Sequence, residues 1–135
     1  MAIPYLACMV AVAAWNRLPP RVLPSIQAVE GGQVGMVHPD ADGSEDLGLM
    51  QVNTRWIVPL ARYTGQSEQV IRERLIGDAC FNIAAAGAIL VTNLAQEHGD
   101  LMRAVGDYHS QDPVLNEQYQ QSVMAAARAL FQQGR

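Results

Sequence analysis

The chain of 135 residues contains no lysine, and its nine basic residues are arginines scattered along the sequence without a run. With a formal net charge of −4, it lacks the clustered basic patch with which proteins follow nucleic acid phosphates, so nucleic acid is not expected as a partner. Aromatic residues are also scarce, at 6%, whereas 50% of the residues are hydrophobic. Because alanine, leucine and valine dominate, the composition favours a helical core over a sandwich of aromatic-rich strands.

No stretch of the sequence resembles a linker or a repeat, and the length suits a single domain over residues 1–135. The apolar opening segment 1–14 lacks a charged start and is too short to span a bilayer. Tyr5, Met9 and Val12 repeat there at helical spacing, so we expect a helix of the folded domain rather than a signal peptide. Any export signal is expected to lie outside this sequence, and no membrane span is expected.

Helical periodicity predicts most of the fold. Ser67, Asp78 and Asp112 belong to the residue types that cap helix N-termini, and Pro113 suits a first helical position. Between residues 34 and 53 turn-forming residues replace the helical period, which predicts a short β-hairpin with arms at 36–37 and 49–52. The fold class is therefore mainly α (α+β). Helices are expected at about 1–15, 21–30, 54–63, 67–76, 79–97 (a buried central helix rich in small residues), 100–108 and from 113 onward.

The two cysteines, Cys8 and Cys80, are far apart in sequence, and neither has the spacing of a metal ligand. Cysteine count alone leaves open whether they are buried free thiols or a disulfide. A bridge that closes so long a loop would add about 4 kcal/mol of stability in the chain-entropy model.

Glu30 is the carboxylate with the most unusual surroundings in the sequence. It falls on the apolar stripe of Val22, Ile26 and Val29, and in the last helical turn, where the helix dipole presents its negative end. Burial and the dipole both raise the pKa of a carboxyl group, which would suit Glu30 to act as a general acid. The alternative is a glutamate that turns into solvent at a frayed helix end, and the local sequence by itself favours that alternative.

Four short motifs occur in the order and spacing found in soluble lytic transglycosylases: Glu30-Gly31-Gly32, Asp42-Gly43-Ser44 with Asp46, the segment Gly48 to Asn53, and Tyr108-His109-Ser110. On these motifs the chain resembles that family, which has a goose-type lysozyme-like fold. It is most similar to the small periplasmic members that accompany secretion and conjugation machines. Two positions depart from the family pattern, because Glu-Gly-Gly replaces the common Glu-Ser-Gly and Tyr-His replaces the common Tyr-Asn.

The resemblance implies an activity on peptidoglycan. Glu30 would protonate the oxygen between N-acetylmuramic acid and N-acetylglucosamine, then accept a proton from the muramyl O6 hydroxyl as it closes a 1,6-anhydro ring. The resemblance thus favours the role of Glu30 as a general acid over that of a solvent-exposed glutamate. It also implies a Cys8–Cys80 disulfide in an oxidising, periplasmic compartment. The expected partners are glycan strands and components of a secretion or conjugation machine. We expect a monomer without cofactor or metal.

The resemblance also implies substrate-binding residues. Gln51 would hydrogen-bond the sugar, which its family position favours over a role in satisfying the loop backbone, whereas Asn53 is evenly balanced between these two roles. Met50 is grouped with them because it is expected to pack near the cleft rather than take part in chemistry. Tyr108 would place its hydroxyl against Glu30, unless it is a core tyrosine with a satisfied hydroxyl.

Ser44, Asp46, Gly31 and His109 are expected to support the site, His109 in a structural role. The hairpin carboxylates could supply a second catalytic group, but aspartates in such loops usually serve turns and caps, and we favour that role. The three histidines are too scattered in sequence to predict a metal site.

Two other functions stay open at this point. A lysozyme-like muramidase would use a hairpin aspartate to position water, and its products would carry reducing muramic ends. A peptidoglycan-binding assembly module with vestigial catalysis would be compatible with the departures at Gly31 and His109.

Overall fold

The computed structural model describes residues 2–132, so Met1 and residues 133–135 of the predicted domain lie outside the described residues. The fold is mainly α with a small antiparallel sheet, which confirms the predicted class. In chain order the elements are α1 (Leu6–Asn16), α2 (Val22–Glu30), β1 (Val37–Pro39), β2 (Glu45–Leu47), β3 (Val52–Asn53), a 3₁₀ helix (Thr54–Trp56), α3 (Ile57–Thr64), α4 (Glu68–Gly77), α5 (Ala79–Gln96), α6 (Leu101–Asp107) and α7 (Pro113–Phe131).

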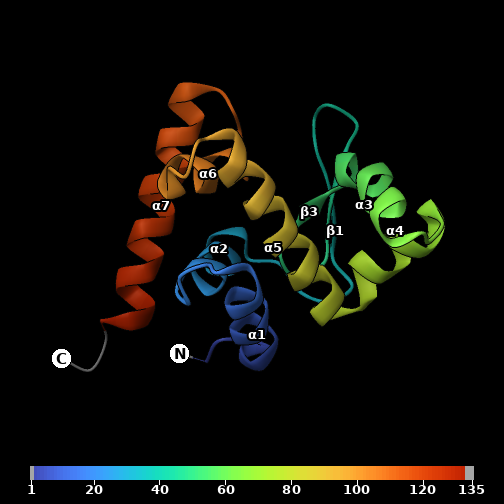
Figure 1. Ribbon diagram of the computed structural model, residues 1–135, viewed down its shortest axis with the longest axis horizontal. Coiled ribbons are helices and arrows are strands. Elements are labelled where there is room, and N and C mark those ends of the chain that lie inside the picture. Colours follow the sequence, from blue (N-terminus) through green and yellow to red (C-terminus); the bar gives the residue numbers. More distant parts are fainter. Residues whose placement is uncertain (1, 133–135) are drawn as a thin grey trace.

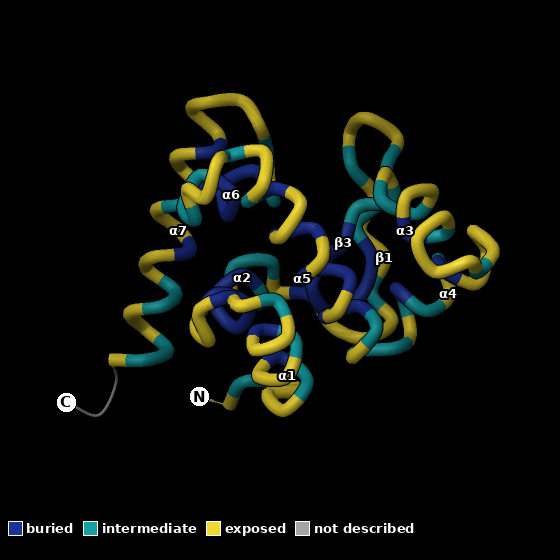
Figure 2. Tube along the Cα trace, viewed as in Figure 1, coloured by how far each residue is buried: buried dark blue, intermediate teal, exposed yellow. Residues whose placement is uncertain are grey.

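The long helix α5 runs through the centre of the molecule (Figure 1). Helices α1, α2, α6 and α7 lie on one side of it, and the strands with α3 and α4 lie on the other. α5 packs against α1, α4 and α6, while α2 packs against α7. The buried parts of the chain gather where these elements meet, and the outer faces of α3, α4 and α7 are exposed (Figure 2).

Small residues allow α5 to occupy this central position, as the sequence predicts. Ala85 and Ala86 are buried, and a side chain at Gly87 would collide with Val12 and Asn16 of α1. By length and composition α5 would also be able to cross a membrane. The core helix of a folded protein passes the same test, and α5 has that position here.

Capping side chains begin the helices where the sequence predicts. At the start of α5, Asp78 accepts a 3.0 Å hydrogen bond from the amide of Phe81, and Ser67 and Asp112 cap α4 and α7 in the same way. Pro113 stands in the first turn of α7, where a missing amide hydrogen costs nothing.

The first helix differs from the prediction in its buried stripe. Met9 and Ala13 are buried, whereas Tyr5 is half exposed and precedes the helix with a left-handed φ of 53°. The predicted stripe was displaced because the apolar character of α1 extends around most of its circumference, which leaves little periodicity to locate the inner face.

The sheet also differs from the predicted hairpin. β1 pairs antiparallel with β2, and β2 with β3, so His38 lies opposite Asp46. The predicted second arm at 49–52 is wrong, since residues 48–51 form a buried turn in which Gly48 and Gln51 have left-handed φ values of 71° and 54°. The true second arm was missed because two of its three residues are acidic, and because buried turns carry the same apolar residues as strands.

A disulfide joins Cys8 of α1 to Cys80 of α5, with 5.5 Å between the Cα atoms. It removes the alternative of two free thiols and confirms the pairing that the resemblance implies. Because the bridge spans 72 positions, it ties the N-terminal helix to the centre of the fold.

Candidate active site

Glu30 is the last residue of α2, and the chain leaves the helix through Gly31. Gly31 has a φ of 66°, the left-handed conformation that commonly ends a helix and that glycine adopts without strain. At Gly32 a side chain would collide with the carbonyl oxygens of Gly48 and Leu49. The two glycines therefore turn the chain sharply and let the end of α2 approach the buried turn that precedes β3.

Glu30 is partly buried, and burial is the main reason why its pKa rises from 4.5 to about 7. The negative charges of Asp46 and Asp40 raise the pKa further, whereas a hydrogen bond from Tyr119 and the nearby His38 lower it. The group is therefore shared between its acid and its carboxylate form near neutral pH. It is suited to give up a proton and to take one back.

Tyr119, and not Tyr108, places its hydroxyl against Glu30. The Tyr119 hydroxyl donates a 2.6 Å hydrogen bond to Oε2 of Glu30 from the buried face of α7. Burial and the adjacent Glu30 hold the pKa of Tyr119 far above its usual range, so the phenol remains a donor in both protonation states of the glutamate. The prediction that Tyr108 contacts Glu30 is wrong. Tyr119 could not be chosen in its place from the sequence, because helical spacing predicts that Tyr119 faces inward but does not predict which residue it contacts.

Tyr108 lies in the same cleft but uses its hydroxyl differently. It donates a 2.7 Å hydrogen bond to the backbone carbonyl of Met50, which fixes the buried turn against the end of α6. Met50 itself is fully buried, and its amide donates a 2.8 Å bond to Asn82 of α5. Met50 thus packs near the cleft, as expected, but its side chain belongs to the core beneath the cleft and does not line it, so its grouping with the substrate-binding residues is wrong.

Gln51 lines the cleft, but its side-chain amide nitrogen serves the loop backbone. Nε2 donates a 3.1 Å hydrogen bond to the carbonyl of Gly48 and a 3.4 Å bond to that of Asp46. Only 8% of the residue is exposed. Among the described residues no hydrogen bond uses the amide oxygen of Gln51, so that oxygen is the atom available to a sugar N–H or O–H group.

Asn53 organises the carboxylates of the sheet. Its Nδ2 donates 3.0 Å to Asp46, 2.9 Å to Ser44 and 3.3 Å to Asp40. Its Oδ1 accepts from the amide of Arg55 and so caps the 3₁₀ helix. Asn53 therefore holds Ser44 and Asp46 together, and all three residues line the cleft.

The other acidic residues of the hairpin divide into two groups. Glu45 forms a 2.7 Å ion pair with Arg72 of α4, and exposed Asp42 binds Ser44 in the turn, which lowers the pKa of Asp42. Asp46 and Asp40 line the cleft, and Asp42 lines it as well. The pKa of Asp46 is raised, first by burial and then by Asp40.

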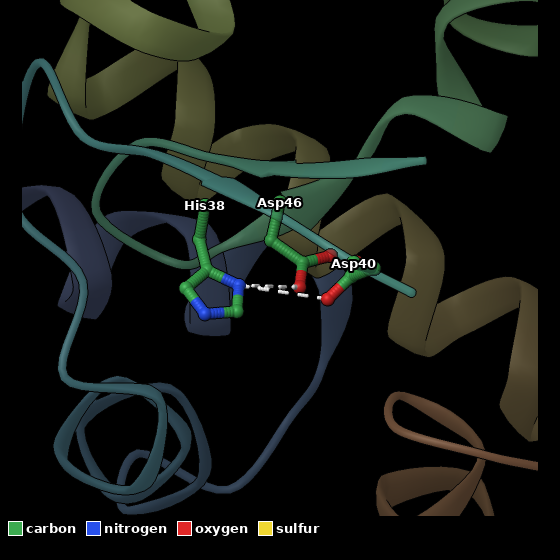
Figure 3. Close-up of side chains that lie close together, drawn as sticks. All are labelled: His38, Asp40 and Asp46. Carbon is green, nitrogen blue, oxygen red and sulfur yellow. Dashed lines mark ion pairs between the residues drawn. The ribbon is translucent and has the colours of Figure 1, made fainter. Parts of the chain in front are cut away.

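His38 joins these two aspartates. Its Nδ1 lies 3.5 Å from Asp40 and 4.0 Å from Asp46, and the three side chains point toward one another (Figure 3). Together they offer ligand atoms within 4.8 Å of one another, the one such group in residues 2–132. This group was not predicted, because the three histidines are scattered in sequence and it is the pairing of β1 with β2 that places Asp46 opposite His38. These are the residues that could hold a metal ion, although His38 is 63% exposed and exposed acidic groups are common without one.

The remaining lining residues come from both sides of the molecule. His109, which is exposed, stacks its ring on Tyr119 with 5.2 Å between the centroids and 12° between the planes. Arg55, Trp56 and Ile89 also line the cleft and were not predicted, because nothing in their local sequence distinguishes them from other helix residues. Arg55 is the one arginine among the lining residues of the cleft.

A scan against models of protein families found none that matches the chain, and a search of curated proteins found no matching relative.

Proposed function

We propose that the chain is a peptidoglycan lytic transglycosylase that cleaves the β-1,4 bond between N-acetylmuramic acid and N-acetylglucosamine. The observation that carries the proposal is Glu30, a partly buried carboxyl group with a pKa of about 7, which lines a polar cleft beside a tyrosine donor. The four sequence motifs support the same activity, because residues from all four contribute to this one cleft.

The hydrogen bond from Tyr119 assigns different tasks to the two oxygens of Glu30. Oε2 accepts from the phenol, so Oε1 is the oxygen that carries the proton toward the glycosidic bond. As the proton leaves, negative charge develops on the carboxylate, and the hydrogen bond strengthens because one partner is now charged. The same carboxylate then accepts the proton of the muramyl O6 hydroxyl, which attacks the anomeric carbon of its own sugar. The product ends in a 1,6-anhydro ring.

This mechanism uses one protein carboxyl group, because the acetamido group of the substrate can stabilise the developing positive charge. Two-carboxylate glycosidases instead need a second acid or base near the sugar. Asp46 and Asp40 line the cleft and keep a second function open, that of a muramidase in which one of them positions water. The two functions differ in their products, which are anhydro ends for the transglycosylase and reducing ends for the muramidase.

The biological setting belongs to the same proposal. A disulfide is compatible with an oxidising compartment, and we propose the periplasm. The proposed role, local cell-wall remodelling during assembly of a secretion or conjugation apparatus, rests on the resemblance of the motifs to those of the family. A binding module with vestigial catalysis would be favoured if the glycine at position 31 impaired Glu30 as an acid. Apart from its chain neighbours, nothing lies within 4 Å of the place that a β carbon at position 31 would occupy.

The test is digestion of purified sacculi by the wild-type protein and by Glu30→Gln, followed by mass spectrometry of the soluble products. Anhydromuropeptides from the wild type, and none from Glu30→Gln at equal sacculus binding, are expected. Binding without release of products by the wild type would favour the assembly module instead.

A further inference from the structure

A second hollow adjoins the cleft at the junction of α5 and α6. It shares Arg55, Trp56 and His109 with the cleft, so a substrate that fills the cleft can extend into it. Its remaining wall is polar and includes Asp107, the last residue of α6, and Asn93 of α5. We call this hollow the side pocket.

Asp107 is the unusual residue of the side pocket. It is only 4% exposed, and its Oδ1 accepts a 2.9 Å hydrogen bond from Asn116 of α7. Its Oδ2 is the one buried side-chain oxygen or nitrogen in residues 2–132 that has no hydrogen-bond partner. Leaving a buried acceptor unpaired is costly, which makes an unpaired oxygen in a pocket wall a candidate for a ligand contact.

The charges around Asp107 define the kind of ligand. Glu97 at the end of α5 stands beside it, and burial together with this second carboxylate raises the pKa of Asp107 to about 6. Arg103 of α6 is the cation that offsets them, and it has the smallest of these effects on Asp107. Asp107 and Glu97 therefore bring together two carboxyl groups that can hydrogen-bond each other only by sharing a proton, and no N–H donor of the described residues bonds Oδ2 of Asp107. A cationic N–H donor satisfies both.

The chain has no lysine, so an ammonium group at this position has to come from the ligand. Glycan strands carry hydroxyl and acetamido groups but no amine. The peptides attached to muramic acid do carry one, the free amino group on the side chain of their diamino acid. Arg55 at the boundary of the cleft and the side pocket could pair with a carboxylate of the same peptide.

We propose that the side pocket binds the peptide of the substrate, with Asp107 as the acceptor for the ammonium group of its diamino acid. This inference rests on the proposed function, because it takes peptidoglycan as the substrate. It adds a determinant of specificity, since strands with peptides would be bound at two places and bare glycan strands at one.

The test measures binding of a synthetic tripeptide that ends in a diamino acid with a free side-chain amine, and of the same peptide with that amine acetylated. Calorimetry and NMR titration would be run on the wild type and on Asp107→Asn. The variant should fold, because the new amide keeps an acceptor for Asn116 and can donate to Glu97. Asp112→Asn is the matched control, since it also removes one carboxylate and asparagine caps helices as well as aspartate does.

Acetylation of the peptide and Asp107→Asn should each weaken binding by about tenfold, as loss of a hydrogen bond to a charged group does. Their combination should add little, because both remove the same contact. Equal affinity for the two peptides, an unaffected Asp107→Asn variant, or no binding at millimolar peptide would each overturn the proposal. The peptide contains no glycosidic bond, so these outcomes do not depend on whether the protein cleaves glycan.

Discussion

The hydroxyl of Tyr119 donates a 2.6 Å hydrogen bond to Oε2 of Glu30 across 89 positions of sequence. This contact links the end of α2 to the buried face of α7 and lowers a pKa that burial raises. It also fixes the orientation of the carboxyl group. Tyr119 touches Glu30 and His109 rather than the cleft itself, so it is a positioning residue in the proposed reaction.

Replacement of Tyr119 by phenylalanine is expected to raise the pKa of Glu30 above its value of about 7 and to reduce kcat by roughly 10–100-fold. A carbon-13 NMR titration of the glutamate carboxyl groups reports the first effect, and a pH–rate profile reports both. Tyr108→Phe is the matched control, because that hydroxyl bonds to the Met50 carbonyl. It should cost about 1 kcal/mol of stability and leave the pKa of Glu30 in place. Equal shifts in the pKa of Glu30 in the two variants would refute the assignment of Tyr119 as the residue that positions Glu30.

The raised pKa of Glu30 also makes stability depend on pH. Folding favours the protonated form, so the stabilisation from this group is complete below pH 4.5 and is lost as the pH rises through about 7. Relative to Glu30→Gln, the wild type should lose up to about 3 kcal/mol across this window. Urea denaturation of both proteins at several pH values measures the difference. Glu117→Gln, on the exposed face of α7, controls for the removal of a carboxylate. If the difference in free energy of unfolding between the wild type and Glu30→Gln did not change with pH, burial would not be raising the pKa of Glu30.

Asp46 distinguishes the two chemistries that the cleft could support. Its negative charge raises the pKa of Glu30, so Asp46→Asn should move the alkaline limb of the pH–rate profile to lower pH. The variant keeps an acceptor for Asn53, and its activity at the new optimum should stay within about tenfold of the wild type. If Asp46 positioned a water molecule, the loss would be far larger at every pH, and the transglycosylase mechanism would have to be abandoned.

The helices could be predicted from sequence more fully than the site. Asp78 and Asp112 hydrogen-bond amides three residues away, so the signal for those helix starts is local. The contact of Tyr119 with Glu30 depends on how α7 packs against α2, and the burial of Met50 depends on a turn that no periodicity marks. No sequence pattern pointed to Asp107, because the feature that distinguishes it is a buried oxygen that tertiary packing leaves without a hydrogen-bond partner.

The disulfide can be tested without any assay of activity. The denatured, unreduced protein should show no free thiol, and Cys8→Ser with Cys80→Ser should lower the free energy of unfolding by about 4 kcal/mol. Detection of two reactive thiols would show that the bridge is absent, and the support that it gives to an oxidising compartment would be lost.

The central claim, that Glu30 serves as acid and then as base without attack by water, is tested most directly by the ends of the released muropeptides. Digestion in ¹⁸O-labelled water followed by mass spectrometry should give 1,6-anhydromuramic ends with no heavy oxygen at the anomeric carbon. Reducing muramic ends that carry the label would show hydrolysis and contradict the account.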